Sequence, residues 1–154
     1  MLLWLKGDKT LTDSHKILIV EDDQDIANIY SLVLQDEGYH TDVARNADEA
    51  LAKVLDFHPD AVLMDIMIPG VDGLEVLRQI RTEARFTHIQ PKIIVTTNIA
   101  QQDKTEIAQK YGAQGYLVKA NIDPHDLGPI VQKLLSGSSA DSSADPVFFT
   151  DIEA

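Results

Sequence analysis

Polar side chains of types that take part in chemistry directly follow four short apolar segments of this chain. The first segment is followed by four carboxylates within residues 21–25, and the others by Asp65, by Thr96 and by Lys119. A carboxylate such as Asp65, placed directly after a buried segment, is costly to bury unless a positive group compensates it. Lys119 is the basic residue whose position after an apolar segment suits that role.

Together these groups have the composition of a metal-assisted phosphoryl-transfer site. Glu21, Asp22 and Asp65 carry three negative charges, and Lys119 offsets only one of them. An all-oxygen set of carboxylates, carbonyls and waters suits Mg²⁺, or Mn²⁺, rather than zinc. With such a cation bound, Asp65 can act as a nucleophile towards phosphorus, since carboxylates form aspartyl phosphates. The cation and Lys119 would neutralise the transferring oxygens, and the Thr96 hydroxyl would hydrogen-bond one of them.

Two simpler interpretations stay open for the parts of this set. Residues 21–25 also suit a solvated loop whose acids complement a helix N-terminus. Asp65 and Lys119 also suit a plain buried ion pair. The combination of all these groups in one chain favours the phosphoryl-transfer hypothesis.

Short apolar segments alternate with helical patterns along the chain. The apolar segments are too short for helices, and most are rich in Ile or Val, as strands buried on both faces are. Apolar residues spaced three and four apart predict the helices between them. This alternation predicts a doubly wound α/β fold, a parallel sheet with helices on both faces. The predicted strands are 17–20, 39–44, 61–64, 93–95 and 116–118, and the helical patterns are 26–33, 47–55, 74–80, 107–111 and 127–135.

The ends of these elements carry matching local signals. Asn46 and Asp103 each precede a glutamate by three residues, which predicts helix N-caps. Asp123 stands before a proline, a pattern typical of a helix start. Gly38 and Gly112 lie where helix C-termini favour a left-handed residue. In a doubly wound sheet the ligand site lies beyond the carboxyl ends of the strands, so the polar residues that follow the strands should meet there.

Composition limits the class of function. The chain has 154 residues, of which 44% are hydrophobic and 25% charged, and its formal net charge is −12. This charge has the wrong sign for a protein that binds a phosphate backbone. No run approaches the roughly 18–20 apolar residues of a membrane span, and the absence of cysteine excludes disulfides and cysteine-based zinc sites. We therefore expect a cytoplasmic protein with no direct nucleic-acid binding and no membrane partner.

The chain divides into three segments that differ in composition and in the periodicity of their apolar residues. Residues 1–15 show no sustained period and form an N-terminal extension, whereas residues 16–135 have the length and periodicity of one domain. Residues 136–154 are rich in Ser and Asp at first, which predicts a flexible tail or linker. The apolar Val-Phe-Phe run within that tail is too short to fold alone.

Four motifs, in order and at the right spacing, resemble the receiver domain of two-component response regulators. The resemblance covers about residues 16–135. The motifs are Ile-Leu-Ile-Val-Glu-Asp-Asp at 17–23, Val-Leu-Met-Asp-Ile-Met-Ile-Pro-Gly-Val-Asp-Gly at 62–73, Ile-Ile-Val-Thr-Thr at 93–97 and Gly-Tyr-Leu-Val-Lys at 115–119.

The resemblance implies a five-stranded, flavodoxin-like sheet in the order 2-1-3-4-5. It also implies that Asp65 accepts a phosphoryl group from a histidine kinase in a Mg²⁺-dependent reaction. Glu21, Asp22, Asp65 and the main-chain carbonyl of Met67 would hold the metal. Lys119 would contact the phosphoryl group, as would Thr96.

The same resemblance implies how the signal leaves the domain. Thr96 and Tyr116 would act as a switch, in which Tyr116 rotates inward from a more exposed position. The implied partners are a sensor histidine kinase or phosphotransfer protein, and a downstream protein target or output domain. The chain would be a monomer or a phosphorylation-dependent homodimer. It would not be an enzyme beyond catalysing its own phosphoryl transfer and hydrolysis.

One position departs from the family pattern. The family usually has proline after the lysine, often with a cis peptide, but Ala120 follows Lys119 here. A cis bond before alanine costs about 3–4 kcal/mol, against about 0.5–1 kcal/mol before proline. We therefore expect a trans Lys119–Ala120 bond and a reshaped loop.

Three rival functions fit the sequence less well. A haloacid-dehalogenase-type phosphatase has a second acid two residues after its nucleophile, where this chain has Met67. A flavodoxin-like mononucleotide binder needs a loop of glycine and hydroxyl residues after its first strand, and the acids of residues 21–25 would repel its phosphate. A pseudo-receiver that binds partners without phosphorylation would not need all five site residues.

Overall fold

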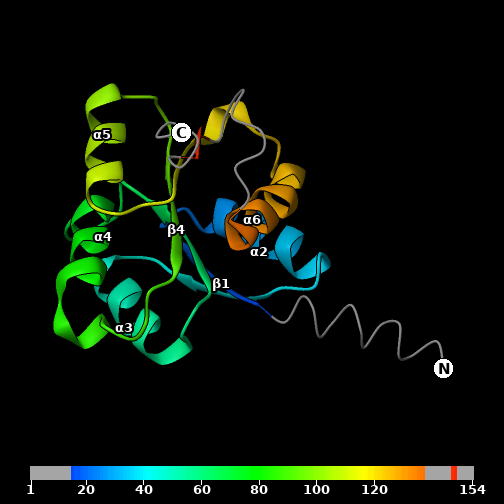
Figure 1. Ribbon diagram of the computed structural model, residues 1–154. Helices are drawn as coiled ribbons and strands as arrows, with labels where there is room; N and C mark the ends of the chain where they lie inside the picture. Colours follow the sequence, from blue (N-terminus) through cyan, green and yellow to red (C-terminus); the bar gives the residue numbers. More distant parts are fainter. Residues whose placement is uncertain (1–14, 138–146, 149–154) are drawn as a thin grey trace.

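A twisted six-stranded sheet forms the centre of the molecule (Figure 1). The structure is a computed structural model that describes residues 15–137 and 147–148, so the predictions for residues 1–14 fall outside it. The strand order is β2-β1-β3-β4-β5-β6. The first five strands are parallel, which confirms the predicted order 2-1-3-4-5. The strands are β1 (Lys16–Val20), β2 (His40–Ala44), β3 (Ala61–Asp65), β4 (Lys92–Thr97), β5 (Gly115–Val118) and β6 (Val147–Phe148).

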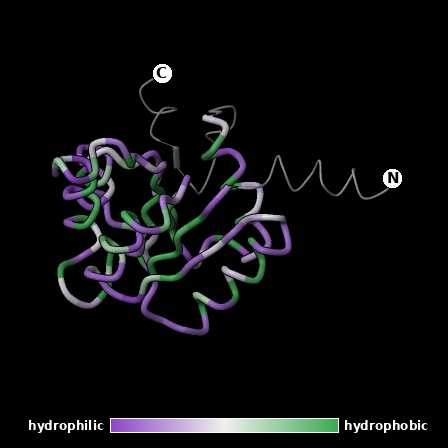
Figure 2. The backbone as a smooth tube through the Cα atoms, turned by 90° about the horizontal axis from the view of Figure 1, so that it is seen from below, coloured by the Kyte–Doolittle hydropathy of each residue, from purple (hydrophilic) through white to green (hydrophobic). Residues whose placement is uncertain are grey.

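Helices cover both faces of the sheet, as predicted. Helices α3, α4 and α5 pack on one face, and α2 and α6 pack on the other (Figure 1). Each face has its own apolar cluster, and the central strands are the most hydrophobic part of the chain in Figure 2. The helices are α2 (Gln24–Asp36), α3 (Ala47–Phe57), α4 (Gly73–Thr82), α5 (Gln102–Lys110) and α6 (Leu127–Ser136), with short 3₁₀ turns η1 (Ala84–Phe86), η2 (Lys119–Asn121) and η3 (Pro124–Asp126).

Most of the predicted helix-end signals are confirmed. The Asn46 side chain accepts a hydrogen bond from the Glu49 N–H at 2.8 Å and so caps α3. Gly38 and Gly112 have φ values of 103° and 96°, in the region that favours glycine. The predicted Asp103 cap is wrong, because α5 already begins at Gln102 and its N-cap residue makes no side-chain hydrogen bond.

The sixth strand was not expected from the sequence. Val147–Phe148 pairs antiparallel with β5, so the sheet has a strand that comes from the segment assigned to a tail. Helix α6 ends at Ser136, one residue beyond the predicted domain boundary.

A partly buried arginine connects α4 to the starts of β4 and β5. The Arg81 guanidinium donates to the carbonyls of Gly112 (3.0 Å) and Pro91 (2.8 Å) and to the side-chain oxygens of Gln90 (3.0 Å) and Gln114 (3.1 Å). Burial lowers the pKa of Arg81 to about 10. All four of these acceptors are neutral, so the charge is solvated by protein dipoles rather than by an opposite charge.

We expect Arg81→Met to reduce the free energy of unfolding by about 2–4 kcal/mol, because it leaves three part-buried acceptors without donors. Arg85→Met is the matched control, since Arg85 is half exposed and pairs with Glu83 on the surface. Its cost should stay within about 1 kcal/mol. Urea unfolding of both variants measures the two losses, and equal losses would contradict the role given to Arg81.

Candidate functional site

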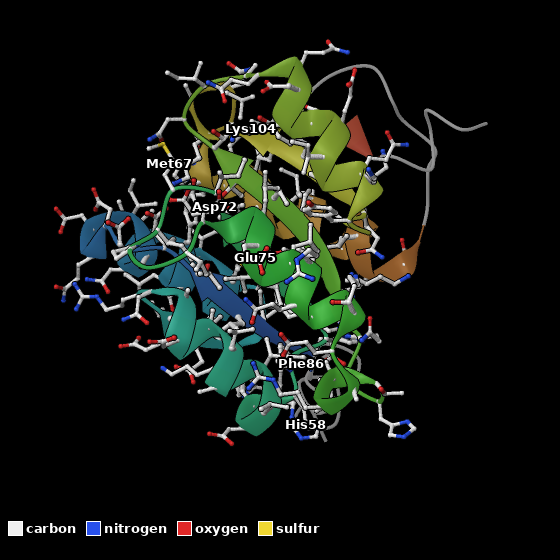
Figure 3. All side chains as sticks on the ribbon, turned by 90° about the vertical axis from the view of Figure 1, so that its left-hand side faces the viewer. His58, Met67, Asp72, Glu75, Phe86 and Lys104 are labelled. Atoms are coloured by element: carbon white, nitrogen blue, oxygen red, sulfur yellow. The ribbon has the colours of Figure 1, made fainter. Side chains whose placement is uncertain are left out.

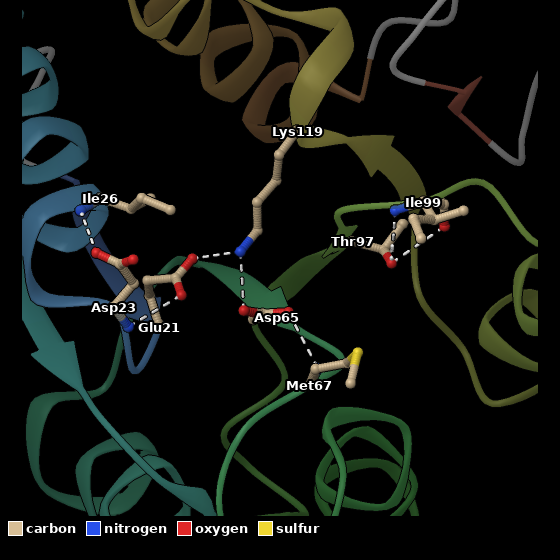
Figure 4. Close-up of polar contacts among 8 residues, drawn as sticks. All are labelled: Glu21, Asp23, Ile26, Asp65, Met67, Thr97, Ile99 and Lys119. Carbon is tan, nitrogen blue, oxygen red and sulfur yellow. Dashed lines mark hydrogen bonds and ion pairs between the residues drawn. The ribbon is translucent and has the colours of Figure 1, made fainter.

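Of the polar groups predicted to meet at the carboxyl edge of the sheet, Glu21, Asp65 and Lys119 are in direct contact there (Figure 4). Lys119, directly after β5, donates from Nζ to Asp65 Oδ2 at 2.8 Å and to Glu21 Oε1. Glu21 follows β1 and Asp65 ends β3, and each residue is only 3% exposed. One ammonium group therefore joins two buried carboxylates from two strands.

The backbone fixes the remaining oxygens of these carboxylates. Asp65 Oδ1 accepts a hydrogen bond from the Met67 N–H at 3.0 Å, and Glu21 Oε2 accepts one from the Asp23 N–H at 3.2 Å. The loop after Asp65 is held close to α4, because Gly73 N–H donates to the Ile66 carbonyl at 2.8 Å. A Cβ on Gly73 would come within 2.1 Å of the Asp65 carbonyl oxygen, so only glycine fits there.

The protonation of the triad reflects both burial and charge. Burial raises the pKa of Glu21, and the hydrogen bond from Lys119 opposes this shift without cancelling it. Burial alone would lower the pKa of Lys119, but its hydrogen bonds to Asp65 and Glu21 outweigh burial and leave that pKa raised. Lys119 is therefore a firmly protonated cation between the two acids.

Three carboxylates at this edge could hold a metal ion. One oxygen from each of Glu21, Asp22 and Asp65 lies within 4.8 Å of the others, and Asp22 is exposed to solvent. Three negative charges and the Lys119 ammonium leave a net charge of −2, which a divalent cation would balance. The all-oxygen donor set fits Mg²⁺ or Mn²⁺, which keep several waters when few carboxylates bind them.

A cavity of about 620 Å³ opens beside this cluster. Its lining includes Asp22 and Met67 from the loops after β1 and β3, Thr97 at the end of β4, and Lys104 from helix α5. Figure 3 shows Met67 and Lys104 at this end of the molecule, with Asp72 at the start of α4 close by. Met67 is 71% exposed, so its side chain stands at the edge of the cavity. The cavity reaches Asp22 and the two residues that directly follow Asp65 in the chain, whereas Asp65 itself is not part of its lining.

The strand register contradicts the predicted pairing of Thr96 with Tyr116. Thr96 is in register with Asp65 on β3 and with Leu117 on β5, so its side chain lies on the face covered by α2 and α6. Tyr116 is in register with Val95 and packs in the opposite cluster. Because side chains alternate across a strand, Thr96 and Tyr116 point to opposite faces.

Thr97 is the hydroxyl residue that shares the face of Tyr116. It is in register with Val118, which packs in the same apolar cluster as Tyr116. Its Oγ1 donates to the Ile99 carbonyl at 3.2 Å (Figure 4), and it lines the cavity, which Thr96 does not. Thr97 was not among the predicted site residues, because the face of each hydroxyl follows from the register of β4 with β5, which the sequence does not show.

Tyr116 is already buried in this structure. It is 3% exposed, and its hydroxyl is buried without a hydrogen-bond partner among the described residues. The expected exposed starting position is therefore not the one observed.

A model of the response regulator receiver domain family matches residues 17–132. The chain belongs to this family. It is 37% identical over 131 residues to the transcriptional regulatory protein ResD of Bacillus subtilis, a match that spans 85% of this chain and 52% of ResD. It is also 36% identical over 119 residues to the response regulator ArlR of Staphylococcus saprophyticus, spanning 77% of this chain and 50% of ArlR. The receiver thus spans about half the length of these curated relatives.

Solved structures agree with this assignment. The chemotaxis response regulator CheY4 of Vibrio cholerae is 30% identical, with a TM-score of 0.70, and the match covers 79% of this chain and 99% of CheY4. A CheY-like receiver domain protein of Methanospirillum hungatei is also 30% identical, with a TM-score of 0.72, covering 80% and 95% of the two chains. None of the helices in the described ranges is long and apolar enough to cross a membrane.

The loop after Lys119 also takes a definite form in this receiver. Lys119–Asn121 make the 3₁₀ turn η2, which the Ile122 N–H closes onto the Lys119 carbonyl at 3.4 Å. The expected trans bond before Ala120 stays a prediction.

In metal-free buffer, we expect the stability of Glu21→Gln relative to the wild type to increase as the pH rises. Because burial raises the folded-state pKa of Glu21, folding favours its protonated form. The stability from this group is complete below the unfolded pKa and is lost as the pH rises through the raised folded pKa. Glutamine cannot ionise and has no such loss. Urea unfolding between about pH 4 and pH 8 measures this difference, and a difference that falls with pH would contradict the shift.

Proposed function

We propose that Asp65 accepts a phosphoryl group and that this chain thereby acts as the phosphorylated switch of a two-component system. One observation carries the proposal: Asp65 is a buried carboxylate at a strand end, held by Lys119 and by the Met67 N–H, with Glu21 and Asp22 converging on it. A plain ion pair would account for Lys119 but not for the exposed third acid, Asp22, or for the cavity beside the cluster.

The reaction is a displacement at phosphorus. A carboxylate oxygen of Asp65 forms a bond to phosphorus while the bond from phosphorus to the donor breaks, and the electron pair leaves with the donor. With a phosphohistidine donor the leaving group is the imidazole nitrogen, and with an acyl phosphate it is a carboxylate. The product is an aspartyl phosphate, which water later hydrolyses.

Residues of this chain have separate tasks in that displacement. Lys119 remains near Asp65 and neutralises charge on the transferring oxygens. Glu21 and Asp22, with Asp65 and the Met67 carbonyl, would hold Mg²⁺, whose chemistry is to neutralise charge on the phosphoryl oxygens. Thr97 replaces Thr96 as the hydroxyl that would bind a phosphoryl oxygen, because it lines the cavity and shares the face of Tyr116.

A phosphatase acting on other substrates is less well supported. General acid–base catalysis needs a titratable group within reach of the reacting atoms. The residue two beyond Asp65 is Met67, whose thioether cannot transfer a proton. We therefore propose that phosphoryl transfer and hydrolysis at Asp65 itself are the chemistry of this receiver.

Exposed apolar side chains suggest where the phosphoryl donor binds. Ile29 and Leu32 on α2 are 46% and 65% exposed, and Met67 and Ile99 stand at the cavity.

A histidine kinase or phosphotransfer protein in the cytoplasm is the proposed donor, and a downstream protein or output domain is the proposed target. We propose that the chain is a monomer, or a homodimer when phosphorylated.

We expect acetyl phosphate with Mg²⁺ to add one phosphoryl group to the wild type and none to Asp65→Asn. Asp60→Asn is the matched control, because Asp60 directly precedes the opposite end of β3, where its side chain accepts a hydrogen bond from the Lys16 N–H. This control should be phosphorylated like the wild type, and chelation of Mg²⁺ should prevent the gain in both. Intact-mass spectrometry measures the product, and a full gain by Asp65→Asn would refute the assignment.

We expect Thr97, and not Thr96, to transmit the modification to Tyr116. Beryllofluoride with Mg²⁺ imitates the phosphoryl group and should shift the amide NMR signal of Tyr116 in the wild type. Thr97→Ala should lose that shift, whereas Thr97→Ser, which keeps the hydroxyl, should retain it. Thr96→Ala should retain it as well, and loss of the shift in Thr96→Ala alone would restore the original assignment.

A further inference from the structure

The outer edge of β5 is covered by a strand from the C-terminal segment of the same chain. Gly115 is in register with Phe148, and Tyr116 with Val147, in antiparallel orientation. This short strand, β6, is drawn in red in Figure 1 and lies along the side of the sheet away from β4. Without it, β5 would be the last strand on this side of the sheet.

Strand geometry fixes which backbone groups face this edge. The Gln114 N–H donates to the Ile93 carbonyl at 2.7 Å, so it points towards β4. Backbone groups alternate in direction along a strand, so the N–H groups of Tyr116 and Val118 also point towards β4. Those of Gly115 and Leu117 then point outward. Gly115 is therefore the residue of β5 that exchanges hydrogen bonds with β6.

The same geometry gives the backbone groups of the two β6 residues opposite directions. Opposite residues of an antiparallel pair alternate between hydrogen-bonded and non-hydrogen-bonded pairs. Phe148 opposes Gly115, so its N–H and carbonyl point towards β5. Val147 opposes Tyr116, so its N–H and carbonyl point away.

An uncovered edge strand offers unpaired N–H and carbonyl groups to any extended segment of another chain. The nine residues between Gly137 and Val147 span at most about 30 Å when extended. This length allows the covering strand to come from the same molecule. Pro146 has no N–H to donate, which limits how far the pairing can continue.

We propose that Val147–Phe148 is a resident edge strand that closes β5 within one chain and excludes extended, apolar segments of other proteins from this edge. The β5 edge is thereby a strand-accepting interaction surface, and its occupant is the chain's own C-terminal segment. This inference concerns the unmodified protein and does not depend on phosphorylation of Asp65.

Amide hydrogen exchange of the full chain, followed by NMR, tests the closure. A truncated chain ending at Gly137 should lose protection of the Gly115 amide by at least about tenfold, which is about 1.4 kcal/mol. The Tyr116 and Val118 amides should keep their protection, because their partners are on β4. Equal protection of Gly115 in the full and truncated chains would overturn the proposal.

Two proline variants make the test specific to the pairing. Phe148→Pro removes the N–H that would donate to the Gly115 carbonyl and puts the proline ring against β5, so it should break the pair and expose the Gly115 amide as the truncation does. Val147→Pro removes an N–H that points away, so it should leave Gly115 protected. Loss of protection in Val147→Pro alone would contradict the inferred orientation.

A peptide with the sequence of residues 145–151 distinguishes the possible occupants of the edge. The peptide should bind the truncated chain at least about tenfold more tightly than the full chain, because the full chain already fills the edge. Equal binding to both would show that the edge is not closed. Protection of Gly115 that disappears on dilution would show that a second copy supplies the strand, which would overturn closure within one chain.

Discussion

The Lys119 ammonium, bonded to two buried carboxylates, is the interaction on which the rest of the site depends. Taking Glu21 and Asp65 out of water costs free energy that a single well-placed cation recovers only in part. The raised pKa of Glu21, caused by burial, is the sign of that incomplete compensation. The negative charge left over at this edge of the sheet is what a divalent cation could balance, and the proposed phosphoryl transfer depends on that balance. The burial of Glu21 and Asp65 therefore lowers the stability of the fold, and the proposed phosphoryl transfer is the function that this cost would serve.

The fold could be predicted because several independent signals agree. Strands such as Ala61–Asp65 are buried along their whole length, and their apolar runs differ in period from the helices between them. The Asn46 cap could be predicted because its short side chain bonds readily to a helix N-terminus. The turn at Gly112 could be predicted because glycine adopts a positive φ without strain. Val147–Phe148 was not visible, because a two-residue strand has no period and its pairing depends on an edge made elsewhere in the chain.

The charged residues of the candidate site could be predicted from the sequence. The hydroxyl residue could not be identified as securely. Glu21, Asp65 and Lys119 meet because every parallel strand brings its carboxyl end to the same edge, so sequence order is enough to place them. Choosing between Thr96 and Thr97 needs the face of each side chain. A one-residue difference reverses that face, and only the register with β5 settles it.

The unpaired hydroxyl of Tyr116 bears on how large a signal the switch requires. A buried polar group without a partner costs about 1–3 kcal/mol, which offsets part of what the ring gains by packing in the apolar cluster. An exposed position of this ring would therefore be closer in free energy to the buried one than it would be for an apolar ring. A modification shifts such an equilibrium only by its differential interaction with the two states. In the proposed switch, one or two charge-assisted hydrogen bonds through Thr97 would then change the population of the ring without any rearrangement of the sheet.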